Sequence, residues 1–365
     1  MKVGILTFHR AINYGAVLQA YALQETLIHL GHEVKVIDYY CPRVEKHDRS
    51  FYSIAMIFRT VLTGHIRRAL FYLRCRQEKK IKLGIFDSFL KKRLKLSAPC
   101  IYDNIPDDID VYIVGSDQVW NTHICEGFDP VFWGLFRRKE KSKIISYAAS
   151  TSISDISGND FNKITTYLSS FSALSVREVE VTVFLNEHIP FHKYRHLAVH
   201  TTIDPTLLAN KDIWDTFDES NSDQNDNYIL VFSARAYKSN PNLMNIKAHQ
   251  LAKEYDCSIK TIDFLHDSPE LFVNKIKKAK AVITSSFHGV AFSIIYSKPL
   301  YAITYGDEQD SRYVNLLRQI GAEKFIFSIN SELKKMNDVG YNDINNNLTL
   351  LKKSSMNFLI ENLQQ

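Results

Sequence analysis

The chain opens with residues 2–39, KVGILTFHRAINYGAVLQAYALQETLIHLGHEVKVIDY. The apolar run at 3–8 is typical of a buried strand, and residues 14–30 place apolar side chains at helical spacing. Gly31 is a good helix stop, and 33–39 predicts a second strand. Because parallel strands need a crossover of this kind, the segment predicts a doubly wound α/β domain.

The alternation of strands and helices continues along the chain in two series. A polar stretch at 218–227, without apolar side chains, separates them as a linker or exposed loop. Strands are predicted in the first series at 111–115, 143–147, 173–176 and 196–203, and in the second at 228–233, 258–264, 281–284 and 300–305. The pattern predicts two Rossmann-like parallel-sheet domains, residues 1–208 and 209–365, and we expect the C-terminal tail to pack back on the first.

A helical insertion interrupts the first domain at about residues 50–95. Its apolar side chains fall on one stripe, while its arginines lie mostly off it. The stripe consists of Phe51, Ile54, Phe58, Val61, Leu62, Ala69 and Leu73. One interpretation is a pair of helices packed on the sheet, and the other is an interfacial surface that touches a membrane or a lipid-linked acceptor.

Composition limits the class of protein. The 365 residues are 45% hydrophobic and 23% charged, which is the balance of a globular protein. A net charge of +5 is too small to indicate nucleic-acid binding, but it suits a small anionic substrate or an acidic membrane surface. Five cysteines without a C-x-x-C pair predict reduced thiols and no structural zinc site, and no motif indicates another metal.

The location of the protein is predicted from its apolar runs. The N-terminal run is shorter than the core of a signal peptide, and no apolar run approaches the roughly 18 residues of a spanning helix. We therefore expect a cytoplasmic protein, either free or peripheral at the inner face of the membrane.

Polar residues that follow predicted strands are candidates for a site, because ligands of open parallel sheets bind beyond the carboxyl ends of the strands. The first strand is followed by Arg10, Asn13 and Gly15. A helix that starts at Asn13 offers free N–H groups to an anion, and Arg10 adds a full charge. Asn13 as a plain helix cap is the alternative interpretation.

The strand at 111–115 is followed by Ser116, Asp117, Trp120 and Asn121. We expect Asp117 to accept a proton from a sugar hydroxyl and Trp120 to stack on a sugar ring. A turn in which Asp117 caps the next helix is the alternative. Together with the residues after the first strand, this group forms the expected acceptor side of a cleft.

The strongest local signal is the segment 284–289, TSSFHG, between a buried strand and a short apolar helix. The hydroxyls of Ser285 and Ser286 and the helix start at Gly289 predict a phosphate pocket, in which His288 titrates near neutral pH. A structural capping histidine is the alternative interpretation.

Three arginines near strand ends or helix starts are candidates for anion binding, namely Arg177, Arg235 and Arg312. A guanidinium clamps a carboxylate or phosphate through two parallel hydrogen bonds. An ion pair with the neighbouring Glu178 is the alternative for Arg177. Asp204 precedes a proline and is interpreted as part of a turn that closes the first domain.

Five stretches together resemble the polysaccharide pyruvyl transferase family, and they occur in the family's order. They are NYGAVLQAYALQ at 13–24, GSDQVWN at 115–121, SVRE at 175–178, DPTLL at 204–208 and SSFHG at 285–289. The resemblance implies a GT-B-like fold, no cofactor, and phosphoenolpyruvate as the donor of a pyruvate ketal to a glycan or lipid-linked sugar during cell-surface or exopolysaccharide biosynthesis. In this family His288 matches the histidine after a late strand, and Ser286 stands where many members have an arginine.

The resemblance leads to a hypothesis in which His288 is the general acid and Asp117 the base. The three arginines would neutralise the donor, and Ser285, Ser286 and N–H groups near Gly289 would hold phosphate oxygens. Two other functions stay open: a GT-B glycosyltransferase that uses a nucleotide sugar, and a catalytically inactive binding protein of a polysaccharide assembly system. The oligomeric state is open as well.

Overall fold

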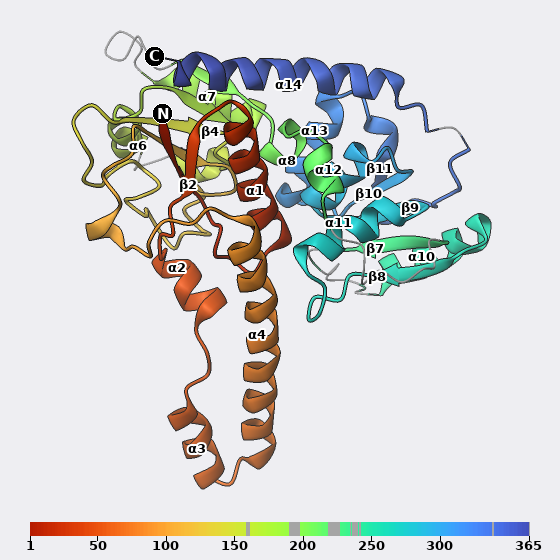
Figure 1. Ribbon diagram of the computed structural model, residues 1–365. Helices are drawn as coiled ribbons and strands as arrows, with labels where there is room; N and C mark the ends of the chain where they lie inside the picture. The colour runs from red at the N-terminus through yellow and green to blue at the C-terminus, as the bar shows by residue number, and fades with distance from the viewer. Residues whose placement is uncertain are drawn as a thin grey trace.

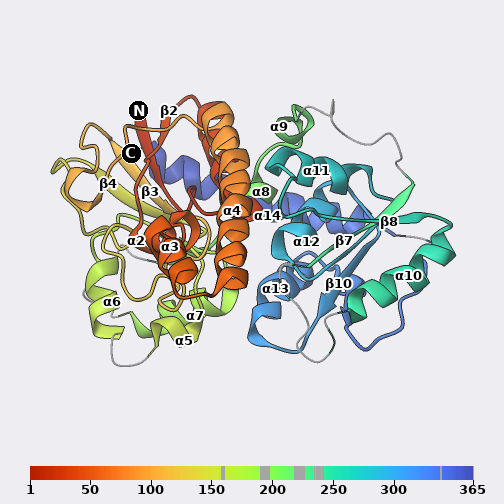
Figure 2. The ribbon, with the colours of Figure 1, turned by 90° about the horizontal axis from the view of Figure 1, so that it is seen from below.

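Two domains lie side by side, each built on a parallel sheet flanked by helices (Figure 1, Figure 2). This computed structural model describes the whole chain except residues 158–160, 190–197, 218–226, 234, 236–239, 241, 338 and 365. The predicted linker at 218–227 therefore lies, apart from Asn227, outside the described residues.

The first domain contains a four-stranded parallel sheet. Its order is β2 (Glu33–Val36), β1 (Lys2–Leu6), β3 (Val111–Gly115) and β4 (Lys143–Tyr147). A parallel pair, β5 (Leu174–Val176) and β6 (Val199–Thr201), continues from β4 through isolated parallel bridges such as Ile145 to Ala173. The helices are α1 (Tyr14–His29), α2 (Pro42–Val44), α3 (Ile54–Leu62), α4 (Ile66–Arg93), α5 (Ile153–Ile156), α6 (Phe161–Leu168) and α7 (Val179–His188).

The second domain contains a five-stranded parallel sheet. Its order is β11 (Ile326–Ser328), β10 (Leu300–Thr304), β9 (Ala281–Thr284), β7 (Tyr228–Phe232) and β8 (Ser258–Thr261). Its helices are α10 (Leu243–Tyr255), α11 (Pro269–Lys278), α12 (Phe287–Ile295) and α13 (Ser311–Gln319), and α8 (Pro205–Leu208) and α9 (Asp212–Asp215) lead into the domain from the first. The predicted α/β fold with two Rossmann-like parallel sheets, the arrangement called GT-B, is confirmed.

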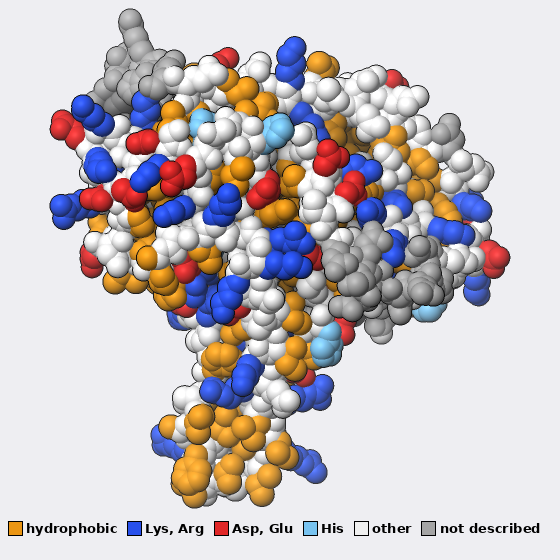
Figure 3. Space-filling model, viewed as in Figure 1, with side chains coloured by type: hydrophobic (Ala, Val, Ile, Leu, Met, Phe, Trp, Pro, Cys, Tyr) orange, Lys and Arg blue, Asp and Glu red, His pale blue; other side chains and the backbone are white. Residues whose placement is uncertain are grey.

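The helical insertion is a hairpin of α3 and α4 that projects from the first domain (Figure 1). Only the last turns of α4 enter the core, where Phe86, Phe89 and Leu90 are buried. At the free end of the hairpin, hydrophobic side chains gather on the surface (Figure 3). No helix in the described part of the chain combines the length and hydrophobicity of a membrane span.

One apolar core runs through both domains. It joins Val3 and Leu18 of the first domain to Leu230 and Val290 of the second. The last helix, α14 (Asn342–Leu363), crosses to the first domain (Figure 1). There the Ile203 N–H donates a hydrogen bond of 3.0 Å to the hydroxyl of Ser355 on this helix. The two domains are therefore joined by packing as well as by the chain.

Candidate functional site

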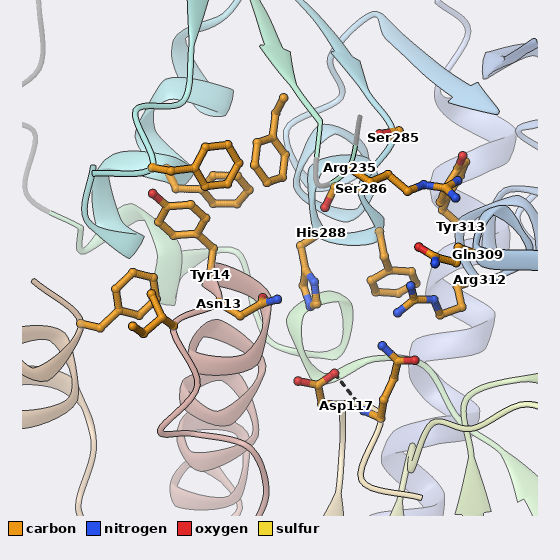
Figure 4. Close-up of a pocket in the computed structure, with 18 of the residues that line it drawn as sticks. Asn13, Tyr14, Asp117, Arg235, Ser285, Ser286, His288, Gln309, Arg312 and Tyr313 are labelled. Carbon is orange, nitrogen blue, oxygen red and sulfur yellow. Dashed lines mark hydrogen bonds between the residues drawn. The ribbon is translucent and has the colours of Figure 1, made fainter. Parts of the chain in front are cut away.

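A cavity of about 400 Å³ lies between the domains (Figure 4). Its walls come from the start of α1, the loop after β3 and the end of β5 in the first domain, and from the ends of β7 and β9 and the starts of α12 and α13 in the second. These are mostly the carboxyl ends of strands, where a ligand site was expected. The predicted residues that line it are Asn13, Gly15, Asp117, Arg177, Arg235, Ser285, Ser286, His288 and Arg312.

His288 reaches from α12 of the second domain to the first domain. Its Nε2 lies 3.8 Å from Oδ2 of Asp204 and has no hydrogen-bond partner among the described residues. The imidazole rests on the backbone of Gly15, because a Cβ at that position would lie 2.0 Å from the Nδ1 atom of His288. The side chain is 13% exposed. The histidine is thus held between a carboxylate and a helix start of the opposite domain.

Asp204 is fully buried beneath the cavity and caps α8, since its Oδ1 accepts hydrogen bonds from the N–H and hydroxyl of Thr206. Its Oδ2 accepts one from Nη1 of Arg177 at 2.8 Å and one from the hydroxyl of Ser116 at 3.3 Å. Asp204 was interpreted as part of a turn, whereas it caps a helix and lies beneath His288. Proline is common at the first helical position, as Pro205 is here, but only the fold brings this cap to the cavity.

Burial controls the protonation of this pair. It lowers the pKa of His288 below the ordinary value of 6.5, and the Asp204 carboxylate, which acts in the opposite direction, does not overcome it. Burial also acts to raise the pKa of Asp204, but His288 when it carries a proton, Arg177 and the hydrogen bonds from Thr206 outweigh it and hold that pKa below its usual range. The unliganded site therefore holds a neutral imidazole beside an ionised carboxylate at neutral pH.

Arg177 is buried and already has protein partners. Besides Asp204, it donates to the hydroxyl of Ser150 at 2.8 Å and to Oε1 of Glu178 at 3.4 Å. Its guanidinium carbon lies 4.4 Å from the centre of the Phe287 ring. The alternative interpretation, a local ion pair with Glu178, is confirmed, and Arg177 also lines the cavity, where its binding of an anion stays a prediction.

Arg312 differs from the other two arginines. It lines the cavity and has no hydrogen-bond or ion-pair partner among the residues that the structure describes. Burial, and then repulsion by Arg177, lower the pKa of its guanidinium, which nevertheless stays charged at neutral pH. Arg235 also lines the cavity, but its charge is compensated by ion pairs with Asp307 and Asp310. Of the three arginines, Arg312 is therefore the one most available to an anionic ligand.

The segment around His288 forms the predicted helix start. Ser286 caps α12 by accepting a hydrogen bond of 3.5 Å from the Gly289 N–H, and the Ser285 hydroxyl shares one of 2.8 Å with Ser233. Gly289 does not line the cavity and its N–H donates to Ser286, so of the predicted segment it is Ser285, Ser286 and His288 that reach the cavity. The lack of a side chain at Gly289 serves packing, because a Cβ would lie 2.3 Å from Oγ1 of Thr284.

Asp117 lies across the cavity from His288, after the end of β3 (Figure 4). Its φ of 66° belongs to the left-handed region, which non-glycine residues seldom occupy. Its Oδ1 accepts a hydrogen bond of 2.8 Å from the N–H of Gln118, which also lines the cavity. The carboxylate is half-buried and faces the space where a ligand would lie.

Four residues predicted for the acceptor side do not line the cavity. Trp120 is only 1% exposed and stacks on Trp133 in the core at 5.2 Å between ring centres, so it cannot stack on a sugar. Arg10 is taken up by ion pairs with Asp38 and Glu45. The other two are Ser116, which is buried against Asp204, and Asn121, which accepts a hydrogen bond from the Ile124 N–H in a turn.

The structure adds residues that the sequence analysis missed. Tyr14 stacks on Phe272 with ring centres 4.8 Å apart, at the contact between the domains. It belongs to an aromatic wall of the cavity, formed by Tyr14, Phe86, Phe232, Phe264 and Phe272. Lys82 of α4 also lines the cavity. Nothing in the sequence around Lys82 indicates this position, because only the fold brings the hairpin to the interdomain cleft.

Solved structures of two known proteins are similar to this structure over nearly the whole chain. The UDP-GlcNAc 2-epimerase from Methanocaldococcus jannaschii is 13% identical, with a TM-score of 0.47 over 96% of this chain and 93% of that one. The glycosyltransferase SnogD from Streptomyces nogalater is 11% identical, with a TM-score of 0.40 over 98% and 95%. Such low scores carry no information about substrate.

The sequence comparisons are more specific. No curated protein matches the chain. The sequence model of the polysaccharide pyruvyl transferases matches residues 13–307, which hold the cavity residues at Asn13, Asp117, Arg177 and His288. Since this match spans most of the chain, the protein belongs to the polysaccharide pyruvyl transferase family, a family of transferases.

Proposed function

We propose that this protein transfers pyruvate from phosphoenolpyruvate to two hydroxyls of a sugar, as a cyclic ketal, in the biosynthesis of a cell-surface or exported polysaccharide such as a capsule. The observation that best supports this proposal is the position of Arg312. Its guanidinium lies in the interdomain cavity near His288 and has no hydrogen-bond or ion-pair partner among the described residues (Figure 4). The family suggests the reaction class. The acceptor is a glycan or lipid-linked sugar, and the reaction uses no cofactor.

The anionic donor needs a positive site, because phosphoenolpyruvate carries a carboxylate and a phosphate. Arg312 is the guanidinium that can pair with it fully, and Arg177 adds positive charge from the opposite wall. The hydroxyls of Ser285 and Ser286 lie at the start of α12, where a helix favours an anion. In this proposal Arg312 replaces, from another helix, the arginine that many members have at the position of Ser286.

Two residues face each other for the proton transfers. His288 donates a proton to the methylene carbon C3, and a sugar hydroxyl attacks the electron-poor C2 while Asp117 accepts the hydroxyl proton. A second hydroxyl then forms the other C2–O bond. The C2–O bond to phosphate breaks, and the proton of the second hydroxyl leaves with inorganic phosphate. The products are the ketal and phosphate, and one proton has passed from His288 to Asp117.

The low pKa of His288 is compatible with an imidazole that takes up its proton when phosphoenolpyruvate binds. Burial keeps its pKa low in the unliganded site, where the positive charges of Arg177 and Arg312 act in the same direction. An anionic donor offsets these charges and raises the pKa of His288. The proton for C3 is thus taken up when the donor binds.

The test is release of inorganic phosphate from phosphoenolpyruvate by the purified protein, with glycan and lipid-linked sugars as acceptors and mass spectrometry of the product. We expect acceptor-dependent release and a pyruvylated product. His288→Ala should lower turnover about 10²- to 10⁴-fold while the circular dichroism spectrum stays unchanged. Consumption of a nucleotide sugar instead would assign a glycosyltransferase, and binding without turnover of either donor would assign an inactive binding protein.

A further inference from the structure

The free end of the α3–α4 hairpin carries a large apolar surface that the rest of the described chain leaves uncovered. Ile54 and Leu62 are 69% and 71% exposed. We call this surface the apolar tip, and it consists of Ile54, Phe58, Val61, Leu62, Ile66, Leu70, Phe71 and Leu73, all of them exposed. None belongs to the three apolar cores of the described structure. Exposed apolar clusters of this kind mark interaction surfaces.

The hairpin holds its large apolar side chains outward. Ile54, Phe58 and Leu62 follow each other at intervals of four along one face of α3, whereas the buried residues between the helices are Ile57 and Ala69. Folding of the hairpin alone gives no reason to leave this many large apolar side chains in water. The outward face is therefore suited to a partner outside the chain.

The positive charge of the hairpin indicates which kind of partner the apolar tip binds. No acidic residue occurs between residues 51 and 77, while Arg59, Arg67, Arg68 and Arg74 lie on the same part of the hairpin. The side chains of Arg59 and Arg67 have no ion-pair partner among the described residues, and Figure 3 shows basic side chains around the hydrophobic end. A second copy of this chain would bring like charges together, whereas a bilayer with anionic lipids supplies an apolar interior beneath negative headgroups.

We infer that the apolar tip inserts into the headgroup region of a bilayer that contains anionic lipids, with the arginines at the lipid phosphates. Helix α4 connects the tip directly to the cavity, from Ile66 to Lys82. At a rise of about 1.5 Å per residue, these two residues are ~24 Å apart along the helix. The inserted hairpin would hold the cavity near the membrane surface, and this docking is independent of the reaction in the cavity.

The experiment is flotation of the purified full chain with vesicles of phosphatidylcholine alone or with phosphatidylglycerol added. We expect binding to the anionic vesicles that weakens as salt is raised. The variant Phe58→Ser/Leu62→Ser/Leu70→Ser should bind more than about tenfold more weakly, because each exposed apolar side chain would otherwise be buried in the interface. The variant Arg59→Gln/Arg67→Gln should bind about tenfold more weakly and respond less to salt.

The matched control replaces exposed apolar residues elsewhere, Val183→Ser/Ile246→Ser/Leu350→Ser, and should bind as the unmodified chain does. Circular dichroism checks that every variant is folded. Equal binding by the tip variant and the control would overturn the inference, as would absence of binding to anionic vesicles at low salt. Dimers in light scattering that only the tip variant abolishes, without vesicle binding, would assign the tip to a second copy and also overturn it.

Discussion

The guanidinium of Arg312 differs from those of Arg177 and Arg235 because it forms no ion pair with a carboxylate of the described residues, although the charges of Glu178 and Asp117 act on it from farther away. The sequence made all three arginines candidates for anion binding, and all three line the cavity. It could not rank them, because an ion pair such as Arg235 with Asp310 joins residues far apart in the chain. For the same reason the sequence could not show that the charge of Arg10 is paired with that of Asp38.

Arg312→Gln should raise the KM for phosphoenolpyruvate by about tenfold to a hundredfold, the range expected for the loss of a charge-assisted hydrogen bond. Steady-state phosphate release over a range of donor concentrations measures it. Arg318→Gln is the control, since Arg318 lies on the same helix and is exposed. If both variants keep the original KM, Arg312 does not bind the donor.

The low pKa of His288 makes the stability of the unliganded protein depend on pH. Below its ordinary value of 6.5, the unfolded chain takes up a proton that the folded protein, where burial keeps the imidazole neutral, does not. The unfolding free energy should therefore fall as the pH drops from about 7 to 5. His288→Asn should reduce this fall, as measured by urea unfolding at several pH values. Parallel curves for the two proteins would contradict the proposed burial of a neutral histidine.

At the scale of elements, the start of α1 meets the start of α12. The sequence predicted both helices, and it predicted a helix start suited to an anion at Asn13. In the structure, the first turn of α1 also serves as a seat for the His288 ring, which lies on Gly15. The contact joins residues that are distant in sequence, so periodicity and capping signals could not reveal it.

Gly15→Ala should lower turnover about as much as His288→Ala, roughly 10²- to 10⁴-fold, because the new Cβ displaces the imidazole. The double variant should be no less active than either single variant. Alanine itself suits a helix, so the circular dichroism spectrum should remain that of a folded protein. The control is Gly84→Ala on α4, where nothing lies within 4 Å of the added Cβ. Near-normal turnover of Gly15→Ala would show that the position of the ring is not critical.

At the scale of the whole molecule, the α/β rhythm of the sequence predicted the two parallel sheets, which the structure confirms. The sequence did not show that one apolar core continues between the domains. Apolar residues on helices such as α1 can face their own sheet or a neighbouring domain, and periodicity alone does not separate the two. Trp120 illustrates the same limit, because the nearby Asp117, Gln118 and Asn121 suggest a polar loop, whereas the Trp120 side chain packs among core residues.

Helix α14 should contribute to the stability of both domains. Phe358 on this helix is buried, and its ring centre lies 5.3 Å from that of His200 in the first domain. Phe358→Ala should reduce the unfolding free energy by about 3 kcal/mol, with a single transition in fluorescence and circular dichroism. Leu350→Ala, at an exposed position of the same helix, should change it by less than about 0.5 kcal/mol. Equal effects of the two variants, or two separate transitions, would show that α14 does not couple the domains.

His288 comes from one domain, and both Gly15 and Asp204 come from the other. Any motion that parts the domains to admit a bulky glycan therefore also withdraws the imidazole from its seat. On the proposed mechanism the site then acts as an interlock, because the proton donor His288 is in place only while the domains are closed. An enol phosphate bound between open domains would in that case be protected from hydrolysis, because only closure brings together the groups that activate it.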